Sequence, residues 1–462
     1  MLAELSVAQA VSQTADTFSG LLLQPGDEGY DAARRVHNGM VDKRPALIAQ
    51  CRGTADVVDA IKLARGLSLE VSVRGGGHNV AGRAVVDGGL MIDLAGMKGI
   101  HVDAARRTVR AQGGATWGGL DRETQLHGLA VTGGAVSTTG IAGLTLGGGI
   151  GWLMGKYGLA LDNLESVELV TADGQVLQAS AEENPDLFWA VRGGGGNFGA
   201  VTSFEYRLFP VGPMITGGLI AWPFDSAREM LRFYRDFTAA IPDEHSVAAT
   251  LVHAPDGSGV KLAAMVACHS GPLAEGGTAV QPIKKFALPV MDLLGPMPYC
   301  QLNRMLDGGY PKGALNYWKS SFLARLDDDA IDTMIECFKH CPTPMGQVLI
   351  EHFHGAATQV DATGTAFPHR QEGYNFLVMS QTMDPAISDR CTEWVRQTYA
   401  AMKPFVAPGR YVNYLDDDET GDSVPAAYGP NYRRLRGIKT KYDPDNFFHM
   451  NQNIIPLPRD IK

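Results

Sequence analysis

Clusters of glycine constrain this chain more than any other feature. The stretch "VSVRGGGHNVAG", from Val71 to Gly82, places three glycines between a strand-like run and His78. Glycine loses more conformational freedom on ordering than any other residue, so a triple glycine at a strand end indicates that the backbone passes close to another group. A turn-rich β domain explains any single cluster, but several together favour a long anionic ligand held by backbone N–H groups. The other clusters lie at residues 113–114, 133–134, 147–151 and 193–196.

Two of these clusters resemble nucleotide-binding motifs in the wrong context. "GGGNFG" (194–199) matches G-x-G-x-x-G, which should follow a strand and open a helix. Here a helix-like "DLFWAVR" precedes it and a strand-like "AVTSFEYRLF" follows. "GLTLGGGIGWL" (143–153) lacks the lysine and serine of a P-loop. A Rossmann fold is therefore disfavoured and a P-loop is excluded.

Length and charge narrow the class of protein. The chain has 462 residues, which indicates two domains, and its net charge of −10 argues against a nucleic-acid partner. Its six cysteines are scattered without a CxxC, which is typical of buried thiols rather than a disulfide frame or a zinc site. Residues 1–13 lack the features of a secretory signal, and no apolar run is long enough to cross a membrane. We therefore expect a cytoplasmic protein.

The order of predicted elements suggests where the domains divide. A strand at 46–51, a helix from an N-cap at Thr54 to about Gly66, and a strand ending at Arg74 form a β-α-β unit. Short strands continue through the next 130 residues or so. Beyond Pro210 glycine becomes rarer and helices alternate with strands, whereas the last fifty residues return to the character of the first part. The predicted units are 1–209, 210–405 and 406–462, the last returning to the first.

Seven motifs together resemble one family. They are "VRGGGHNVAG", "GGLMIDL", "GGATWGGL", "GGIGWLMGKYGLALDNL", "NPDLFWAVRGGGGNFGAVT", "YVNYLD" and "YDPDNFFHMNQNI". The set is similar to the berberine-bridge-enzyme-like flavoproteins of the vanillyl-alcohol-oxidase/PCMH superfamily, over roughly 45–210 and 365–456. The resemblance implies an α+β, two-domain PCMH-type fold. In it, both chain ends build an FAD-binding domain around a central α/β substrate domain with an antiparallel sheet.

The resemblance implies that His78 is covalently bonded to the flavin, and a neutral imidazole is a competent nucleophile for that bond. Many relatives have a second anchor, a cysteine, at the position that Val136 occupies here. Valine cannot form this bond, so we expect FAD attached through His78 only. Bacterial members of the 6-hydroxy-D-nicotine oxidase type, and the flavoenzyme of enterocin biosynthesis, share this arrangement.

The same resemblance implies the other cofactor contacts. Thr139 occupies the position that controls oxygen access, and its modest size favours an oxidase while leaving an oxygenase open. The remaining residues are Arg74, Gly75, Gly76, Gly77, Asn79, Gly134, Ser137, Gly140, Gly143, Gly148, Gly149, Gly151, Val201, Tyr411, Asn451 and Asn453.

Proton transfer is expected near "YVNYLD", which supplies Tyr411 and Tyr414. On an ideal strand both cannot point into one cleft, so Tyr411 is the first candidate and ordinary packing is the alternative. Relatives carry a glutamate or glutamine where Leu377 stands, and leucine cannot accept a proton.

Three other residues remain as candidates for the acid–base work. Asn375 is a candidate cleft residue, and Glu351 or His352 is a candidate base. His352 and His354 form an H-x-H pair without a convincing third ligand, so we expect no metal.

We therefore expect an FAD-dependent oxidase of an alcohol or amine carbon in a small molecule, with hydride transfer to flavin N5. Molecular oxygen is the expected acceptor, secondary metabolism the expected setting, and a homodimer is allowed. The alternatives are a flavin-dependent oxygenase or oxidative cyclase, and a non-catalytic FAD-fold protein. Four aromatic residues of the central part either line the cleft or fill a core: Tyr299, Tyr310, Tyr317 and Trp318.

Overall fold

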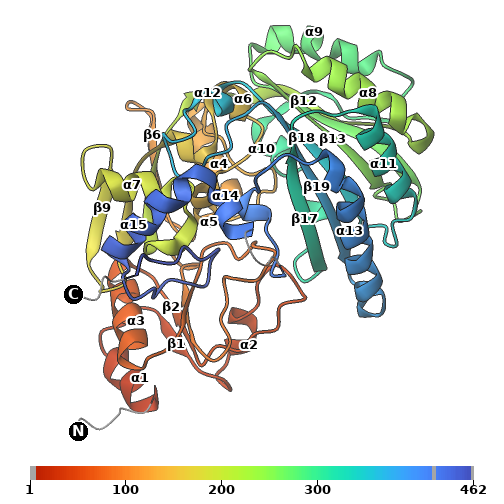
Figure 1. The fold of residues 1–462 in the computed structure, drawn as a ribbon. Coiled ribbons are helices and arrows are strands. Elements are labelled where there is room, and N and C mark those ends of the chain that lie inside the picture. Colours follow the sequence, from red (N-terminus) through yellow and green to blue (C-terminus); the bar gives the residue numbers. More distant parts are fainter. Residues whose placement is uncertain (1–6, 419–422, 459–462) are drawn as a thin grey trace.

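The computed structural model describes residues 7–418 and 423–458, and places two β-rich regions side by side (Figure 1). The first region holds strands β1 to β11 together with the C-terminal helices, and the second holds strands β12 to β19. The described residues do not include 1–6, 419–422 and 459–462. The predicted domain units extend over all three segments, and the predicted absence of a secretory signal concerns the first. Helices and both parallel and antiparallel strands occur together, which is the expected α+β class.

A four-stranded sheet carries the first glycine cluster. Its order is β1-β2-β4-β3, and β2, β4 and β3 run parallel. Helix α3 (Thr54–Gly66) connects β2 to β3, which confirms the predicted β-α-β unit. The predicted cap is wrong, because Thr54 is the first helical residue and its hydroxyl donates to Glu168 Oε1 at 2.7 Å. The strands are β1 (Leu21–Leu23), β2 (Leu47–Gln50), β3 (Val71–Arg74) and β4 (Leu90–Asp93).

The second sheet of this region is antiparallel, with the order β5-β6-β10-β8-β9. The C-terminal helix α15 (Tyr432–Tyr442) lies beside α7 (Pro185–Val191) in Figure 1 and contacts it. Lys439 of α15 is buried and donates to the backbone oxygen of Asn197 at 2.7 Å, so the chain end docks back as expected. The strands are β5 (Ile100–Asp103), β6 (Thr108–Gln112), β8 (Leu164–Val170), β9 (Val176–Ser180) and β10 (Ala200–Arg207).

One large antiparallel sheet, in the order β15-β12-β14-β13-β18-β19-β17 with β16 beside β12, forms the second region. Four helices cover the face that points away from the first region (Figure 1): α8 (Ala227–Thr238), α9 (Leu273–Lys284), α11 (Asp328–Lys339) and α13 (Ser388–Met402). Side chains alternate along each strand, so Ala249 and Leu251 pack under the helices while Ala248 and Thr250 face the first region. The strands are β12 (Met214–Pro223), β13 (His245–His253), β14 (Lys261–His269), β15 (Met291–Asp292), β16 (Gly295–Pro298), β17 (Leu315–Leu323), β18 (Gln347–Phe353) and β19 (Gly373–Thr382).

Short elements complete the described chain, and in it no helix has the length and apolar character needed to cross a membrane. The strand expected in "YVNYLD" is wrong, because Val412–Tyr414 forms a 3₁₀ turn. The remaining helices and strands are α1 (Val7–Ala15), α2 (Tyr30–Ala33), α4 (Trp117–Thr124), α5 (Ile141–Gly147), α6 (Met154–Tyr157), α10 (Tyr299–Leu302), α12 (Ala356–Gln359), α14 (Ser423–Tyr428), β7 (Leu129–Ala130) and β11 (Phe209–Pro210).

Candidate active site

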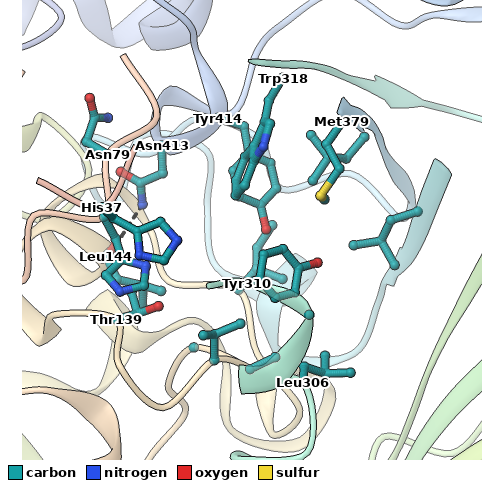
Figure 2. Close-up of a pocket in the computed structure, with 18 of the residues that line it drawn as sticks. His37, Asn79, Thr139, Leu144, Leu306, Tyr310, Trp318, Met379, Asn413 and Tyr414 are labelled. Carbon is teal, nitrogen blue, oxygen red and sulfur yellow. Dashed lines mark hydrogen bonds between the residues drawn. The ribbon is translucent and has the colours of Figure 1, made fainter. Parts of the chain in front are cut away.

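A cavity of about 760 Å³ lies between the two regions. The glycine loops of the first region form one wall, and the open face of the large sheet forms the other. In Figure 2, His37 and Thr139 lie on one side, Met379 on the other, and Tyr310, Trp318 and Tyr414 between them. The predicted cofactor residues that line the cavity are Gly75, Gly76, Gly77, His78, Asn79, Gly134, Val136, Thr139, Gly140, Gly143, Val201, Tyr411 and Asn451.

The triple glycine has a steric cause. A Cβ on Gly76 would stand 2.3 Å from the backbone nitrogen of Gly140, so the two loops meet backbone to backbone. Gly77 has a φ of +69°, which favours glycine. Gly143 has nothing within 4 Å of its would-be Cβ and lines the cavity. The loops therefore present bare backbone to the cavity, as a ligand lying against them requires.

His78 lies at the end of this loop and lines the cavity. Its ring stacks on that of His37, with 4.1 Å between the ring centroids and 20° between the planes. Burial lowers the pKa of His78 to about 3, with the neighbouring His37 acting in the same direction, so the imidazole is neutral near pH 7. Neutral imidazole is the form that can act as a nucleophile. The sequence analysis missed His37, because nothing in "RRVHNGM" distinguishes a ring that will pack against His78.

Two side chains of the cavity wall, Arg83 and Gln452, have polar atoms without a hydrogen-bond partner in the described part of the chain. Arg83 Nε and Gln452 Nε2 are buried without a hydrogen bond among the described residues, and both residues line the cavity. Asn453 Oδ1 is also unpartnered, although Asn453 does not line the cavity. Unpaired buried donors indicate a polar ligand, and together with the bare glycine loops they fit a dinucleotide.

Two predicted cofactor residues have other partners. Arg74 lies off the cavity, and its guanidinium pairs with Asp93, its register partner on β4, and with backbone oxygens including that of Arg35. Ser137 donates from its N–H and its hydroxyl to the Asp307 carboxylate, at 2.8 and 2.6 Å. Both donor sets are used within the protein, and neither Arg74 nor Ser137 lines the cavity, so their contacts with the cofactor stay predictions.

Gly148, Gly149 and Gly151 also lie off the lining of the cavity. The N–H of Gly149 donates to the Tyr411 hydroxyl at 3.0 Å, and a Cβ on Gly151 would stand 1.8 Å from the oxygen of Gly133. This cluster therefore allows tight packing behind the cavity, and its contact with the cofactor stays a prediction.

Glu351 is the one carboxylate among the described residues that line the cavity, and it is half-buried. It lies on β18, opposite Asn375 of β19, and Asn375 Nδ2 donates to Glu351 Oε2 at 2.6 Å. The Tyr414 hydroxyl donates to the same carboxylate. Burial raises the pKa of Glu351 to about 7 against the lowering effect of these two hydrogen bonds. Asn375 itself does not line the cavity, so it contacts Glu351 and not the cleft.

Both tyrosines of "YVNYLD" reach the cavity. The 3₁₀ turn brings residues three apart to one side, and the rings of Tyr411 and Tyr414 lie 4.8 Å apart. The Tyr411 hydroxyl accepts from Gly149, Ile150 and Asn413, so it holds the surrounding backbone in place. Tyr414 instead contacts Glu351, which makes it the better placed of the two for proton transfer.

The four candidate aromatic residues and the two histidines of β18 and the loop after it do not all face the cavity. Tyr310 and Trp318 line the cavity, whereas Tyr299 and Tyr317 pack in hydrophobic cores. His352 and His354 stack at 4.5 Å in a separate cavity of about 260 Å³, so His352 lies on the opposite face from Glu351 and does not reach the candidate active site.

Two family models match the chain: "FAD binding domain" over residues 45–180 and "Berberine and berberine like" over residues 410–455. An FAD-linked oxidoreductase of Dictyostelium discoideum is 31% identical, over 97% of both chains. The chain belongs to the berberine-like FAD-linked oxidoreductases. The (R)-6-hydroxynicotine oxidase of Paenarthrobacter nicotinovorans is 32% identical to the present chain, and the match covers 95% of the present chain and 97% of the oxidase.

The solved structures agree with the family. The crystal structure of 6-hydroxy-D-nicotine oxidase from Arthrobacter nicotinovorans superposes with a TM-score of 0.87 at 30% identity, and the match covers 95% of this chain and 98% of that one. The predicted PCMH-type fold, FAD as cofactor and oxidation of a small organic molecule are thereby confirmed. The named relatives are oxidoreductases and oxidases, so the oxygenase alternative is not favoured and a non-catalytic protein is excluded.

Proposed function

We propose that this FAD-linked oxidoreductase oxidises an alcohol or amine carbon and that Glu351 accepts the O–H or N–H proton released in the reaction. One observation carries the proposal: a half-buried carboxylate with a pKa of about 7 lies in the cavity wall, between the Tyr414 hydroxyl and the Asn375 amide. A base of this pKa accepts a proton near neutral pH without holding it too tightly. The bound FAD supplies the hydride acceptor.

The neighbours of Glu351 have distinct parts in this proposal. Asn375 orients the carboxylate and stabilises its charged form by donating one hydrogen bond. Tyr414 donates to the same group from the cavity side, so it can relay a proton between substrate and carboxylate. Leu377, two residues along β19 from Asn375, lines the cavity as an apolar contact. In this proposal Glu351, on the adjacent strand β18, takes the place of the glutamate or glutamine that relatives carry at the position of Leu377.

The proposed FAD attachment is a single bond to His78. Neutral His78 lines the cavity, and Val136, at the position of the second anchor, lines it too. None of the six cysteines, all within the described residues, lines the cavity. The proposed electron acceptor is molecular oxygen, because Thr139 presents a small side chain at the cavity wall. Four expectations stay predictions. They are the domain bounds 1–209, 210–405 and 406–462, the cytoplasmic location, the homodimer and the role in secondary metabolism.

Glu351→Gln tests the proposed base. The rate of flavin bleaching by substrate under anaerobic conditions should fall by about 100-fold or more, because general base catalysis contributes that much. The wild-type rate should rise with pH through about 7, while the Glu351→Gln rate should not show this rise. The matched control is Glu336→Gln, which changes an exposed glutamate of α11 and should leave both rate and profile unchanged. An unchanged pH profile in Glu351→Gln would remove Glu351 as the base.

A further inference from the structure

The open face of the large sheet continues well beyond Glu351. Two residues back along β18, Leu349 pairs with Thr250 of β13, and Thr250 pairs with Ala264 of β14. Ala264 in turn pairs with Ala221 of β12. All four side chains line the same cavity as Glu351, so one continuous floor crosses four strands.

The far part of this floor is apolar, and we call it the apolar arm: Ala221, Val252, Leu262, Ala264, Met291 and Leu293. Ala221, Leu262 and Ala264 form a buried hydrophobic cluster of their own. Ala221 and Ala264, at the centre, are small and almost fully buried, with 1% and 0% of their surface exposed. Leu293, at the outer end, is 58% exposed, so the arm opens towards solvent there.

Polar side chains between Glu351 and the arm are already paired. The Tyr310 hydroxyl donates to Gln347 Oε1 at 3.0 Å, and Gln347 Nε2 donates to Thr250 Oγ1 at 2.8 Å. Thr250 Oγ1 donates to the oxygen of Val348 at 3.0 Å. These three side chains therefore use their polar groups within the wall, whereas Gln381 Oε1 and His253 Nδ1, of two other lining residues, have no partner among the described residues. Among the described residues that line the cavity, the Asp, Glu, Lys and Arg side chains are Arg83 and Glu351, both outside the arm.

The span of the arm sets the size of its ligand. Three strand spacings separate β18 from β12. At about 4.8 Å each they give about 14 Å, which corresponds to an extended alkyl chain of roughly ten carbons. A sugar chain of that length would lose its hydrogen bonds to water on entering the arm and find no free partners there, which is costly.

We propose that the substrate of this enzyme carries an extended apolar tail, which lies in the apolar arm while the oxidised carbon lies beside Glu351. The choice of the reacting end rests on the proposed function, whereas the tail site rests on the sheet face alone. Binding is driven by burial of the tail against Val252, Met291 and Leu293, the members of the arm whose side chains are still partly or largely exposed.

Straight-chain primary alcohols from butanol to dodecanol test the arm. Their binding to the Glu351→Gln holoprotein is measured by calorimetry without oxygen and with the flavin already reduced, so that no alcohol is oxidised whichever residue is the base. Affinity should rise about fourfold per added methylene. The rise should level off near roughly ten carbons, where the chain passes Leu293 into solvent. Affinity that does not depend on chain length would overturn the proposal and leave the proposed base untouched.

Ala264→Phe and Ala264→Val, each made in the Glu351→Gln protein, locate the tail. Each fills the middle of the arm, so the rise in affinity should stop at a shorter chain, and the effect of Phe should exceed that of Val. Ala264→Val keeps the test informative if Ala264→Phe does not fold. The control, Ser258→Phe, adds the same ring at an exposed position between β13 and β14 and should leave the series unchanged. A series that rises equally in the Glu351→Gln protein with and without Ala264→Val would place the tail elsewhere and overturn the proposal.

Discussion

The two walls of the cavity are built by different means. The wall from the first region is backbone: Gly76 touches Gly140, and both line the cavity. The wall from the large sheet is made of side chains such as Glu351, Leu349 and Met379, which alternate with core residues along their strands. A backbone wall leaves glycine clusters in the sequence, whereas a side-chain wall is defined only once strand register is known. The wall of glycine loops can therefore be recognised from short sequence motifs, whereas the wall of side chains depends on how distant strands pair.

The backbone wall should be the more fragile. Gly76→Ala places a Cβ 2.3 Å from the backbone nitrogen of Gly140, where no flexible side chain can move away. We expect a loss of about 3 kcal/mol in stability and purified protein with little flavin. The measurements are Tm and the ratio of flavin to protein absorbance. Gly66→Ala, at the end of α3 with nothing within 4 Å, is the control and should retain both. A flavin-replete Gly76→Ala protein would show that the loops have more freedom than their contact suggests.

Substitution of the two stacked histidines distinguishes covalent attachment of the flavin from ring packing. His78→Ala should release flavin into the supernatant after acid precipitation, because the proposed bond is lost. His37→Ala should keep the flavin in the pellet, although its ring lies 4.1 Å from that of His78. Intact mass of both variants gives the number of attached FAD groups. Flavin retained by His78→Ala would contradict the proposed single bond.

The side-chain wall should respond by a shift in pH dependence. Asn375→Leu removes a hydrogen bond that lowers the pKa of Glu351, while burial, which raises it, remains. The rise of the oxidation rate with pH should therefore move upward from about 7 by roughly one unit. The pH profile of flavin reduction measures this. Ser320→Ala, which changes a buried residue of the neighbouring β17, is the control and should leave the midpoint in place. A downward shift in Asn375→Leu would show that Asn375 does not stabilise the charged form.

The smallest effect is expected where the two walls meet. Ser137→Ala removes the hydroxyl that donates to Asp307 at 2.6 Å but keeps the backbone N–H that donates to the same carboxylate. We expect a loss of about 1 to 2 kcal/mol in stability, measured by Tm, with unchanged flavin content. Loss of flavin in Ser137→Ala would instead support the predicted role of Ser137 in the cofactor site.

The local motifs predicted much of the fold. The β-α-β unit around α3, the strand before the triple glycine and the docking of the C-terminal segment follow from patterns of a few dozen residues, and all are present. The motifs did not predict side-chain partners that are distant in sequence. Arg74 pairs with Asp93 across two strands, and Ser137 pairs with Asp307 from the other region. A motif identifies a residue but not the group that its side chain will meet.

The glycine clusters alone predicted that bare backbone would lie against a long anionic ligand, because only glycine permits such a close approach. The tertiary structure decided which acid–base group faces the cavity. Glu351 reaches it because β18 pairs with β19 in a register that sets Glu351 opposite Asn375, and because a 3₁₀ turn brings Tyr414 onto the same carboxylate. Burial then raises its pKa to about 7, and burial is a property of the packed molecule and not of the residue.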